Sequence, residues 1–496
     1  MPHTASAIDN AALPILCVDL DGTLVKSDTL HDSALAVARH HPAALLHLPA
    51  WLLQGKAALK RHLAATVQLD VAHLPYNREL VQYLEQQHAT GRPIYLATAA
   101  DADTAQRVAD HLGLFTGVLA SDGQLNLAGK NKLAAFQSQF GDNFSYIGNA
   151  IPDLTLLESC KEPMVANPTP ALRAALRKAR VIPVRTFNET ASSFKSWLKA
   201  IRLHQWAKNV LIFLPLLLAH IHAPGLVAGA ILAFFSFGLC ASATYIVNDL
   251  LDLEADRQHP RKRRRPFASG DLSALAGVAV AILFLAASLA LALLVPVVIA
   301  AISPNSALLR PHQFLLWLGI YLVTTLAYSL RLKRAVLVDV IVLSGLYTIR
   351  IIAGSAATGV AVSTWLAGFS IFFFLSLAFV KRFAELENLR DRGGVSAGGR
   401  GYHITDIEQL RSFGSASGYA SVVVLTLYIS NLDAAQLYQH TNRLWLLVPV
   451  LLLWISRLWF RASRGQLDED PVVYAITDRR SLLMGALVVL IVLSAL

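Results

Sequence analysis

The sequence predicts two domains of different fold class: an N-terminal α/β domain with a parallel sheet and a helical cap, then an all-α polytopic membrane domain of about nine transmembrane helices. Three observations lead to this prediction. Apolar residues make up 55% of the 496 residues and charged residues 15%, whereas soluble proteins contain about 25% charged residues. Before Trp197 short apolar runs alternate with helical patterns, and after it they lengthen to membrane-spanning size. We place the domains at residues 1–190 and 191–496.

The N-terminal domain shows the alternation of a doubly wound sheet. PILCVDL, PIYLATA and FSYIGNA have the continuous apolar character of strands that are buried on both faces. RELVQYLEQQ and DTAQRVADHLG, which lie between them, have helical spacing. Such a sheet binds ligands at the carboxyl ends of its strands. Roughly 65 residues separate the first two strands, too many for one crossover helix, and predict an inserted helical cap.

The second domain contains nine apolar runs close to the length of about 20 residues that crosses a bilayer as a helix. They lie near 205–222, 226–247, 272–297, 313–330, 336–357, 364–380, 416–430, 444–460 and 482–496. Trp206, Trp445 and Trp459 stand near the ends of runs, which is typical of interfacial anchors. Gly345 and Gly354 are expected to let helices approach closely.

Loop charge predicts the orientation. Lys and Arg gather in loops 248–271, 331–335 and 381–415 (including Arg392) and in the loop before the last run, while the other loops hold only Arg310 and Arg443. By the positive-inside rule these loops and the N-terminal domain face the cytosol, and the chain lies in the inner (cytoplasmic) membrane. The N-terminus lacks the pattern of a cleaved signal peptide.

The partners are limited by charge and cysteine content. Net charge is +10, but the basic residues lie between apolar runs, which favours anionic lipid and phosphorylated substrates over nucleic acid. The three cysteines, Cys17, Cys160 and Cys240, show no metal-binding spacing and fit a reducing compartment. The sequence does not indicate an oligomeric state.

The loop after the second apolar run carries a group of acidic and amide side chains. Asn248, Asp252 and Asp256 recur every four residues, so on a continuing helix they form one stripe, with Asp249 beside it. Carboxylates at the end of a membrane helix are costly unless they are hydrated, paired or bound to a cation. Oxygen ligands one turn apart suit Mg²⁺, which commonly binds through one or two carboxylates and substrate phosphates. We therefore predict a magnesium site at these four residues.

A basic run follows directly, from Arg257 to Arg265. Arginine offers forked donors to phosphate oxygens, so Arg261 and Arg265 are candidate substrate ligands. A solvated loop that obeys the positive-inside rule would account for the arginines, but not for acidic and amide groups on one face. The loop therefore favours a site for a metal-bridged diphosphate.

NDLLDLEAD resembles the NDxxDxxxD motif of the UbiA prenyltransferase superfamily, nine-helix intramembrane enzymes that use Mg²⁺ and isoprenoid substrates. The resemblance extends from Ile201 to the C-terminus and includes RLHQWAKN. Within the superfamily the chain looks most like the decaprenyl-phosphate phosphoribosyltransferase branch, on HPRKRRRPFASG, YSLRLKRAVLVDVIVLSGLYTIRIIAG, VKRFAEL, RGYHITD and DEDPVVYAITDRR. This branch uses phosphoribosyl diphosphate as donor and polyprenyl phosphate as acceptor. Aromatic prenyltransferases of the superfamily carry a second acidic pair, DxxxD, where DVIVLSG here has only Asp339.

Several residues are candidates to hold the acceptor phosphate or the ribose 5-phosphate. Arg350 falls inside an apolar run, where an unpaired charge would be costly. For Lys333, Lys381 and Arg382 a simple positive-inside charge is an equal alternative. Asp339 is either a metal ligand or the partner of a nearby arginine. The full candidate set is Lys208, Lys333, Arg350, Lys381, Arg382 and Asp339.

In the N-terminal half, DLDGT resembles the first motif of the haloacid dehalogenase (HAD) phosphatase superfamily, a Rossmann-like α/β fold. The resemblance covers about residues 10–190 and makes Asp19 the nucleophile and Asp21 the general acid/base. Thr98 matches the second motif, and Lys132, or alternatively Lys130, matches the phosphate-binding lysine. The last motif appears as GNAIPD, with Asn149 and Asp153. The implied magnesium ligands are Asp19, Asp21, Asn149 and Asp153, although an amide at Asn149 also allows a degenerate, structural domain.

These resemblances imply a two-step function. The membrane domain would transfer 5-phosphoribose from phosphoribosyl diphosphate to polyprenyl phosphate, and the HAD-like domain would remove the 5-phosphate of the product. Linker 184–197 would keep the two sites at high effective concentration. One alternative is prenyl transfer from polyprenyl diphosphate to an aromatic or other small acceptor. Another is a membrane transporter with a regulatory soluble domain, although no paired interrupted spans are present.

Overall fold

The computed structural model describes residues 14–189, 193–306, 310–390, 400–431, 437–467 and 471–496. Arg392 and part of linker 184–197 lie outside the described residues. Contacts divide the chain into two compact units, Met1–Ile201 with Tyr245–Val280, and Arg202–Thr244 with Ala281–Leu496. The loop with the acidic motif is therefore grouped with the N-terminal residues. The boundary at residues 190 and 191 stays a prediction.

The first unit is built on a six-stranded sheet in the order β3-β2-β1-β4-β5-β6, and all its strand pairs are parallel. The strands are β1 Ile15–Val18, β2 Ile94–Asp101, β3 Gly117–Ser121, β4 Phe144–Gly148, β5 Pro163–Ala166 and β6 Arg185–Phe187. The predicted parallel sheet is confirmed. The strand order reverses between β1 and β4, and in such sheets the ligand site lies beyond the carboxyl ends of the strands at this point.

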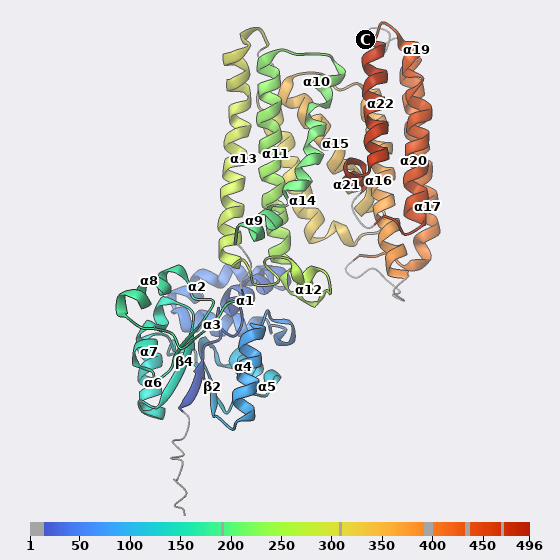
Figure 1. Ribbon diagram of the computed structural model, residues 1–496. Helices are drawn as coiled ribbons and strands as arrows, with labels where there is room; N and C mark the ends of the chain where they lie inside the picture. Colours follow the sequence, from blue (N-terminus) through green and yellow to red (C-terminus); the bar gives the residue numbers. More distant parts are fainter. Residues whose placement is uncertain (1–13, 190–192, 307–309, 391–399, 432–436, 468–470) are drawn as a thin grey trace, which may run out of the picture. The chain divides into compact units, whose positions relative to one another are not determined.

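Two apolar cores cover the two faces of the sheet, because successive side chains of a strand point to opposite faces. Leu16 and Val18 of β1 lie in one core with residues of α4 and α5, while Cys17 lies in the other with residues of α6, α7 and α8. Figure 1 shows α4 and α5 on one side of the strands and α6 and α7 on the other. The helices are α4 Arg78–Ala89, α5 Ala102–Leu112, α6 Lys130–Phe140, α7 Leu154–Ser159 and α8 Pro170–Ala179.

Between β1 and β2 the chain forms further helices, as expected for an inserted helical segment. Asp28 caps the first of them by accepting hydrogen bonds from the backbone N–H groups of Leu30 and His31. These helices are α1 Thr29–His40, α2 Leu48–Leu53 and α3 Lys56–Thr66. After β6 follows α9 Ser193–Ile201.

Within the described residues, seven helices are long and apolar enough to cross a membrane. They are α11 Pro224–Leu251, α13 Ala274–Ile302, α14 Gln313–Leu330, α15 Val338–Thr358, α16 Thr364–Arg390, α17 Ile407–Ile429 and α20 Leu447–Ser463, the last two extended at their N-terminal ends by short helices. The predicted run 205–222 forms a 3₁₀ segment, Leu203–Phe213, and the short α10 Leu214–Leu218. The predicted last run forms α22 Arg479–Ala495. Nine spans therefore stay a prediction.

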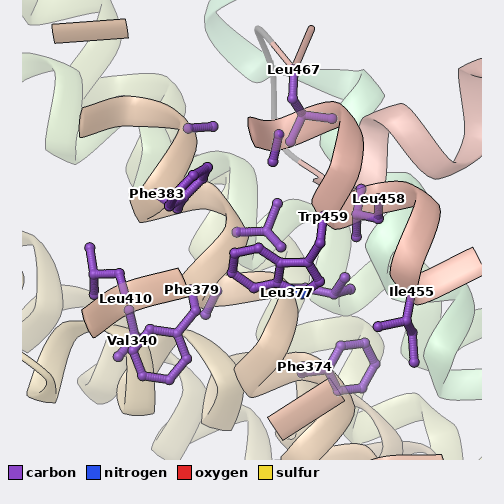
Figure 2. Close-up of a cluster of buried hydrophobic side chains, with 14 of the residues drawn as sticks. Val340, Phe374, Leu377, Phe379, Phe383, Leu410, Ile455, Leu458, Trp459 and Leu467 are labelled. Carbon is purple, nitrogen blue, oxygen red and sulfur yellow. The ribbon is translucent and has the colours of Figure 1, made fainter. Parts of the chain in front are cut away.

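The largest core of the second unit lies between α16, α17 and α20 (Figure 2). Trp459 is 7% exposed, and its indole N–H donates to the Ser376 Oγ at 3.2 Å. The prediction that Trp459 is an interfacial anchor is wrong, because its ring packs into this core. The expectation for Gly354 is confirmed, since a Cβ there would stand 2.0 Å from the Ile212 carbonyl oxygen. At Gly345 it is wrong, because no neighbouring helix in the described part of the chain comes within 4 Å of a Cβ added there.

Candidate functional site

The carboxyl ends of β1 and β4 bring together a buried cluster of charged side chains. Asp19 follows β1, and its Oδ1 accepts a hydrogen bond from the Lys132 Nζ at 2.8 Å. The same Nζ donates to the Tyr146 hydroxyl at 3.0 Å, and that hydroxyl donates to the Asp153 Oδ1 at 2.7 Å. Lys132 comes from the first turn of α6, so three separate elements meet at this point. Lys132, and not Lys130, is the lysine that reaches Asp19.

The turn after Asp19 places the second aspartate. The Oδ1 of Asp21 accepts a hydrogen bond from the Thr29 backbone N–H at 2.7 Å, which ties the turn to the start of α1. Gly22 has φ +75°, and a Cβ on it would stand 2.0 Å from the Asn149 Nδ2. Glycine fits here because it adopts a positive φ without strain and has no Cβ to collide with Asn149. Asn149, at the end of β4, therefore packs against the turn of the DLDGT motif.

Burial governs the acidity of both aspartates. It raises the pKa of Asp19 to about 6, with Lys132 opposing the shift and Asp153 adding to it. Burial also raises the pKa of Asp21 to about 7, and the negative charge of Asp28 adds to it. Burial acts to lower the pKa of Lys132, but Asp19 and Asp153 raise it above its ordinary value. The lysine is therefore held as a cation beside the nucleophile candidate.

The fit of this cluster to Mg²⁺ depends on its oxygen atoms. The Oδ2 of Asp153 accepts hydrogen bonds from the backbone N–H groups of Asn149 and Ala150, both at 3.0 Å, and its Oδ1 accepts from Tyr146. Nowhere in the described part of the chain do three His, Cys, Asp or Glu side chains form a metal-binding group. Two carboxylates and one amide oxygen, from Asp19, Asp21 and Asn149, still suit Mg²⁺, which completes its shell with water and phosphate oxygens. A ligand role for Asp153 stays a prediction.

These residues open into a cavity of about 420 Å³. Lys60, from α3 in the inserted helical segment, also lines it and was not singled out from the sequence. Its Nζ donates to the Ala99 carbonyl oxygen at 2.6 Å and to the Asn126 Oδ1 at 3.2 Å. The pKa of Lys60 is lowered by burial. Only the expectation that a cap covers the site could have drawn attention to it, because no motif surrounds it.

Thr98 lies inside β2, which continues to Asp101, two residues beyond the predicted strand PIYLATA. The side chain is 1% exposed, and its Oγ accepts a hydrogen bond from the Ala100 N–H at 3.0 Å. Ala99, the next residue, lines the cavity, whereas Thr98 is not among the described residues that do. Its proposed contact with phosphate stays a prediction.

The acidic motif lies where α11 ends and the short α12, Leu253–Gln258, begins. The backbone N–H of Asp252 donates to the Asn248 carbonyl at 2.9 Å, and that of Asp256 to the Asp252 carbonyl at 2.8 Å. The four-residue repeat therefore continues through the junction, as the predicted stripe requires. Asp249 and Asp256 are buried, and both accept from Nη1 of Arg265, at 2.9 and 2.7 Å. Burial raises the pKa of Asp256, and Arg265 opposes the shift.

Two further ion pairs join this loop to α1 within the same unit. Arg39 Nη2 lies 3.2 Å from the Asp252 Oδ1. Arg257 is buried, and its guanidinium donates to the Asp32 Oδ2 at 2.9 Å and to the Ser27 Oγ at 3.1 Å. Arg261 is exposed, so of the two predicted phosphate-binding arginines only Arg265 lies among the carboxylates. The three carboxylates are thus paired with arginines and do not form a metal-binding group of three in the described residues, so the magnesium site at Asn248, Asp249, Asp252 and Asp256 stays a prediction.

In the second unit, Arg350 lies on α15 and is buried. Its Nε donates to the Asn209 Oδ1 at 2.9 Å and its Nη2 to the Tyr321 hydroxyl at 3.1 Å. Lys208 Nζ stands 5.2 Å from the centre of the Tyr347 ring, over which Arg350 also lies. The structure therefore groups Lys208 and Arg350, two of the predicted phosphate ligands, around one tyrosine. Asn209 and Tyr321 were missed, although Asn209 ends the quoted RLHQWAKN.

Asp339 is fully buried and engaged at both oxygens. Its Oδ2 accepts a hydrogen bond from Nε of Arg382, and its Oδ1 accepts from the Tyr402 hydroxyl. Arg382 also donates to the Tyr328 hydroxyl at 2.7 Å. These contacts favour the arginine-partner alternative for Asp339 over the metal-ligand one. Lys333 lies in the 3₁₀ turn Leu332–Arg334, and Lys381 lies on α16.

Comparison with protein families shows to which family the membrane half is related. The model of the UbiA prenyltransferase family matches residues 210–483. The chain belongs to the UbiA prenyltransferase family. Together with the seven long apolar helices, this membership makes it an integral membrane protein.

Relatives of this UbiA chain include proteins matched over its whole length and over its membrane half. It is 39% identical over 484 residues to uncharacterized protein y4nM of Sinorhizobium fredii, covering 96% of this chain and 90% of that protein. It is 30% identical over 295 residues to a decaprenyl-phosphate phosphoribosyltransferase of Mycolicibacterium smegmatis, covering 57% of this chain and 86% of that protein. A solved UbiA homologue from Archaeoglobus fulgidus, bound to GPP and Mg²⁺, aligns with 17% identity and a TM-score of 0.44 over 60% of this chain and 99% of that one.

Proposed function

We propose that the membrane domain transfers 5-phosphoribose from phosphoribosyl diphosphate to a polyprenyl phosphate, on the cytosolic side of the inner membrane. The observation that carries this proposal is the difference between the two acidic positions. The motif at Asn248–Asp256 carries three carboxylates, whereas the second position has Asp339 alone, which is held by Arg382 and Tyr402. One metal motif suits one diphosphate substrate and a separate lipid monophosphate. The similarity to proteins named decaprenyl-phosphate phosphoribosyltransferase supports the same reaction.

The transfer needs positioning and electrostatics more than proton transfer. An oxygen of the lipid phosphate forms a bond to the ribose anomeric carbon, while the bond from that carbon to the diphosphate oxygen breaks. The diphosphate leaves with the bonding electrons, and the acceptor oxygen, already anionic, needs no base. Mg²⁺ held by Asn248, Asp252 and Asp256 would neutralise charge on the leaving group. Arg265 fixes Asp249 and Asp256, and the buried cations Lys208 and Arg350 suit a phosphate oxyanion.

We further propose that residues 1–190 act as a HAD-type phosphatase on the 5-phosphate of the product. Asp19 attacks the phosphorus, the phosphorus–oxygen bond to the sugar breaks, and Asp21 supplies the proton to the leaving alkoxide. Water then cleaves the aspartyl phosphate and releases inorganic phosphate. A pKa of about 7 suits Asp21 to this acid/base role. Lys132, 2.8 Å from Asp19, balances the charge of the phosphoryl oxygens, and bound Mg²⁺ would add to this.

The transferase proposal is tested with the full chain purified in detergent. We expect Mg²⁺-dependent diphosphate release when phosphoribosyl diphosphate and polyprenyl phosphate are both present, and loss of activity when the metal is chelated. Asp252→Asn should raise the Mg²⁺ concentration for half-maximal rate, because one charged ligand is lost. Glu254→Gln, on the same loop but off the stripe, is the control. Turnover only with polyprenyl diphosphate and an aromatic acid would contradict the proposal.

Prenyl transfer to a small acceptor is the second candidate function. Membership of the UbiA prenyltransferase family is the observation that favours it. It predicts release of diphosphate from polyprenyl diphosphate in the same assay, without phosphoribosyl diphosphate.

A further inference from the structure

Three lysines lie among the described residues that line the cavity at the ends of β1 and β4. Lys132 pairs with Asp19 at 2.8 Å, and Lys26 Nζ lies 3.9 Å from the Asp271 Oδ1. Lys60 differs from both, because no carboxylate of the described residues lies within 4.0 Å of its Nζ. A partly buried cation without an ion-pair partner is unfavourable unless a ligand supplies the opposite charge.

Neutral groups hold Lys60 in place. Its Nζ donates to the Ala99 carbonyl oxygen near the carboxyl end of β2 and to the Asn126 Oδ1 in the loop after β3. An ammonium group has three N–H donors, so one remains for a ligand in the cavity. Lys60 comes from α3 of the inserted helical segment, whereas Lys132 comes from α6. The two ammonium groups therefore reach the cavity from separate elements.

The charges around Lys60 indicate on which side of the cavity it lies. Burial lowers its pKa, and nearby carboxylates oppose this shift, Asp21 most strongly, then Asp28 and then Asp19. Lys60 therefore interacts more strongly with Asp21 than with Asp19. In the proposed phosphatase reaction Asp21 protonates the leaving group, while Asp19 binds the phosphorus. Lys60 thus belongs to the side of the leaving group.

Attachment of the inserted helical segment does not account for this position. Arg61, the next residue of α3, is exposed, and its Nη1 donates to the Asp122 carbonyl oxygen in the loop after β3 at 2.8 Å. Arg61 is not among the described residues that line the cavity. Contact between α3 and this loop is therefore made without a cation in the lining. What Lys60 adds is a positive charge inside the cavity.

We propose that Lys60 determines the specificity of the phosphatase site by binding a second anionic group, which the substrate carries on the part that leaves. This inference rests on the proposed phosphatase function and adds a substrate-binding residue to it. The phosphate that is removed lies at Asp19 and Lys132, and the second anion lies at Lys60. As the phosphorus–oxygen bond breaks, Asp19 keeps the phosphoryl group and Asp21 protonates the leaving oxygen, so Lys60 takes no part in bond making. A phosphodiester on the sugar, as the proposed transfer reaction would give, is such an anionic group.

The test compares two soluble substrates on the full chain in detergent. Both are ribose 5-phosphates. In one the anomeric carbon carries a methyl phosphodiester, and in the other a methoxy group, so the leaving groups differ by one negative charge. We expect kcat/KM for release of the 5-phosphate to be at least about tenfold higher with the phosphodiester, the scale of a hydrogen bond to a charged group. Lys60→Met should remove this preference, while hydrolysis of the methoxy substrate changes little.

Arg61→Met is the matched control, because it removes the neighbouring cation and its contact with the loop but leaves the described cavity lining unchanged. The wild-type preference should persist in this variant. Lys60→Gln is a second test, because the amide keeps a donor for the Ala99 carbonyl oxygen but has no charge. Retained hydrolysis of the methoxy substrate reports that each variant is folded.

Equal wild-type kcat/KM for the two substrates would overturn this inference and leave the proposed phosphatase function standing. A preference retained in both Lys60 variants would do the same. If Arg61→Met lost the preference as fully as Lys60→Met, attachment of α3 would be the cause, and the inference would again be overturned. If the wild type released phosphate from neither substrate, the proposed phosphatase function and the inference would both be overturned.

Discussion

At the scale of single residues, Asp19 combines two requirements of a nucleophile. It is buried, which raises its pKa, and it is bonded to Lys132, which favours its ionised form. Removal of the carboxylate charge takes away the nearer of the two carboxylates beside Lys132, the other being Asp153 at 3.9 Å, and removes the attacking oxyanion. The pair is therefore the part of the site at which one substitution has the largest effect.

We predict that Asp19→Asn lowers phosphate release at least about a thousandfold, the scale of loss when a nucleophile is replaced. Diphosphate release by the membrane domain should be retained, because this reaction does not use Asp19. Both products are measured in one detergent sample. Asp122→Asn, an exposed carboxylate whose loss leaves the cavity lining unchanged, is the control. Residual phosphate release close to the wild-type rate would exclude Asp19 as the nucleophile.

The sequence allowed the meeting of Asp19 and Lys132 to be predicted, because a motif marks each residue even though 113 positions separate them. It could not predict Lys60, which reaches the cavity only through the packing of α3. For Asp339 it left two roles open. The hydrogen bond from Tyr402, 63 positions away, helps to show that Asp339 is an arginine partner and not a metal ligand. No local sequence pattern predicts that contact.

At the scale of elements, the strand β2 is held at its N-terminal end by Arg92, which is buried. Its guanidinium donates at 2.7 Å to the Pro14 carbonyl, to the Ser145 Oγ and to the Glu162 Oε2. These acceptors lie at the starts of β1, β4 and β5. One side chain therefore ties together the amino ends of four parallel strands, opposite the end that carries the candidate site.

We predict that Arg92→Met weakens this end of the sheet by about 3 kcal/mol, because a buried charged hydrogen-bond network loses its donor. Hydrogen exchange of β4 and β5 peptides should show the loss, and exposed Arg177→Met is the control. Arg92 and Ser145 lower the pKa of Glu162 despite its burial. The contribution of the pair is thus present above the ordinary pKa of 4.5 and is lost as pH falls through the lowered value. Unchanged exchange in Arg92→Met would contradict this role.

Hydropathy predicted the elements where length and apolar character agree, as in α11 and α13. It could not predict that residues 203–213 form a 3₁₀ segment, because apolar content carries no information about helix type. Trp459 was misjudged for a related reason. Its position near a span end fits an interfacial anchor. However, Gly414 on a neighbouring helix leaves space for the ring, and Ser376 on another accepts a hydrogen bond from its N–H. Both outcomes depend on tertiary packing.

At the scale of the whole molecule, composition separated the two kinds of domain, but it could not show where Tyr245–Val280 belongs. Apolar runs assign this segment to the membrane half, since it connects two spans. Its ion pairs to Arg39 and Asp32 instead place it with the sheet in one compact unit. Such pairs join residues more than 200 positions apart and leave no periodic signal. The same segment therefore carries the acidic motif and part of the lining of the cavity at Asp19 and Asp21.

The buried pair of Arg257 and Asp32 attaches the segment 253–274 to the sheet unit, and this attachment can be tested by substitution. We predict that Arg257→Met destabilises the attachment of the segment by about 3–5 kcal/mol, because Asp32 is left buried without its partner. The double variant Arg257→Met with Asp32→Leu should recover much of this loss, since an apolar pair removes the unpaired charge. Limited proteolysis between residues 253 and 274 measures the attachment, and exposed Arg263→Met is the control. A double variant cut as fast as the single one would mean that the unpaired charge of Asp32 is not the cause of the loss. Equal resistance of the single variant and the wild type would show that the other contacts of the segment hold it without Arg257.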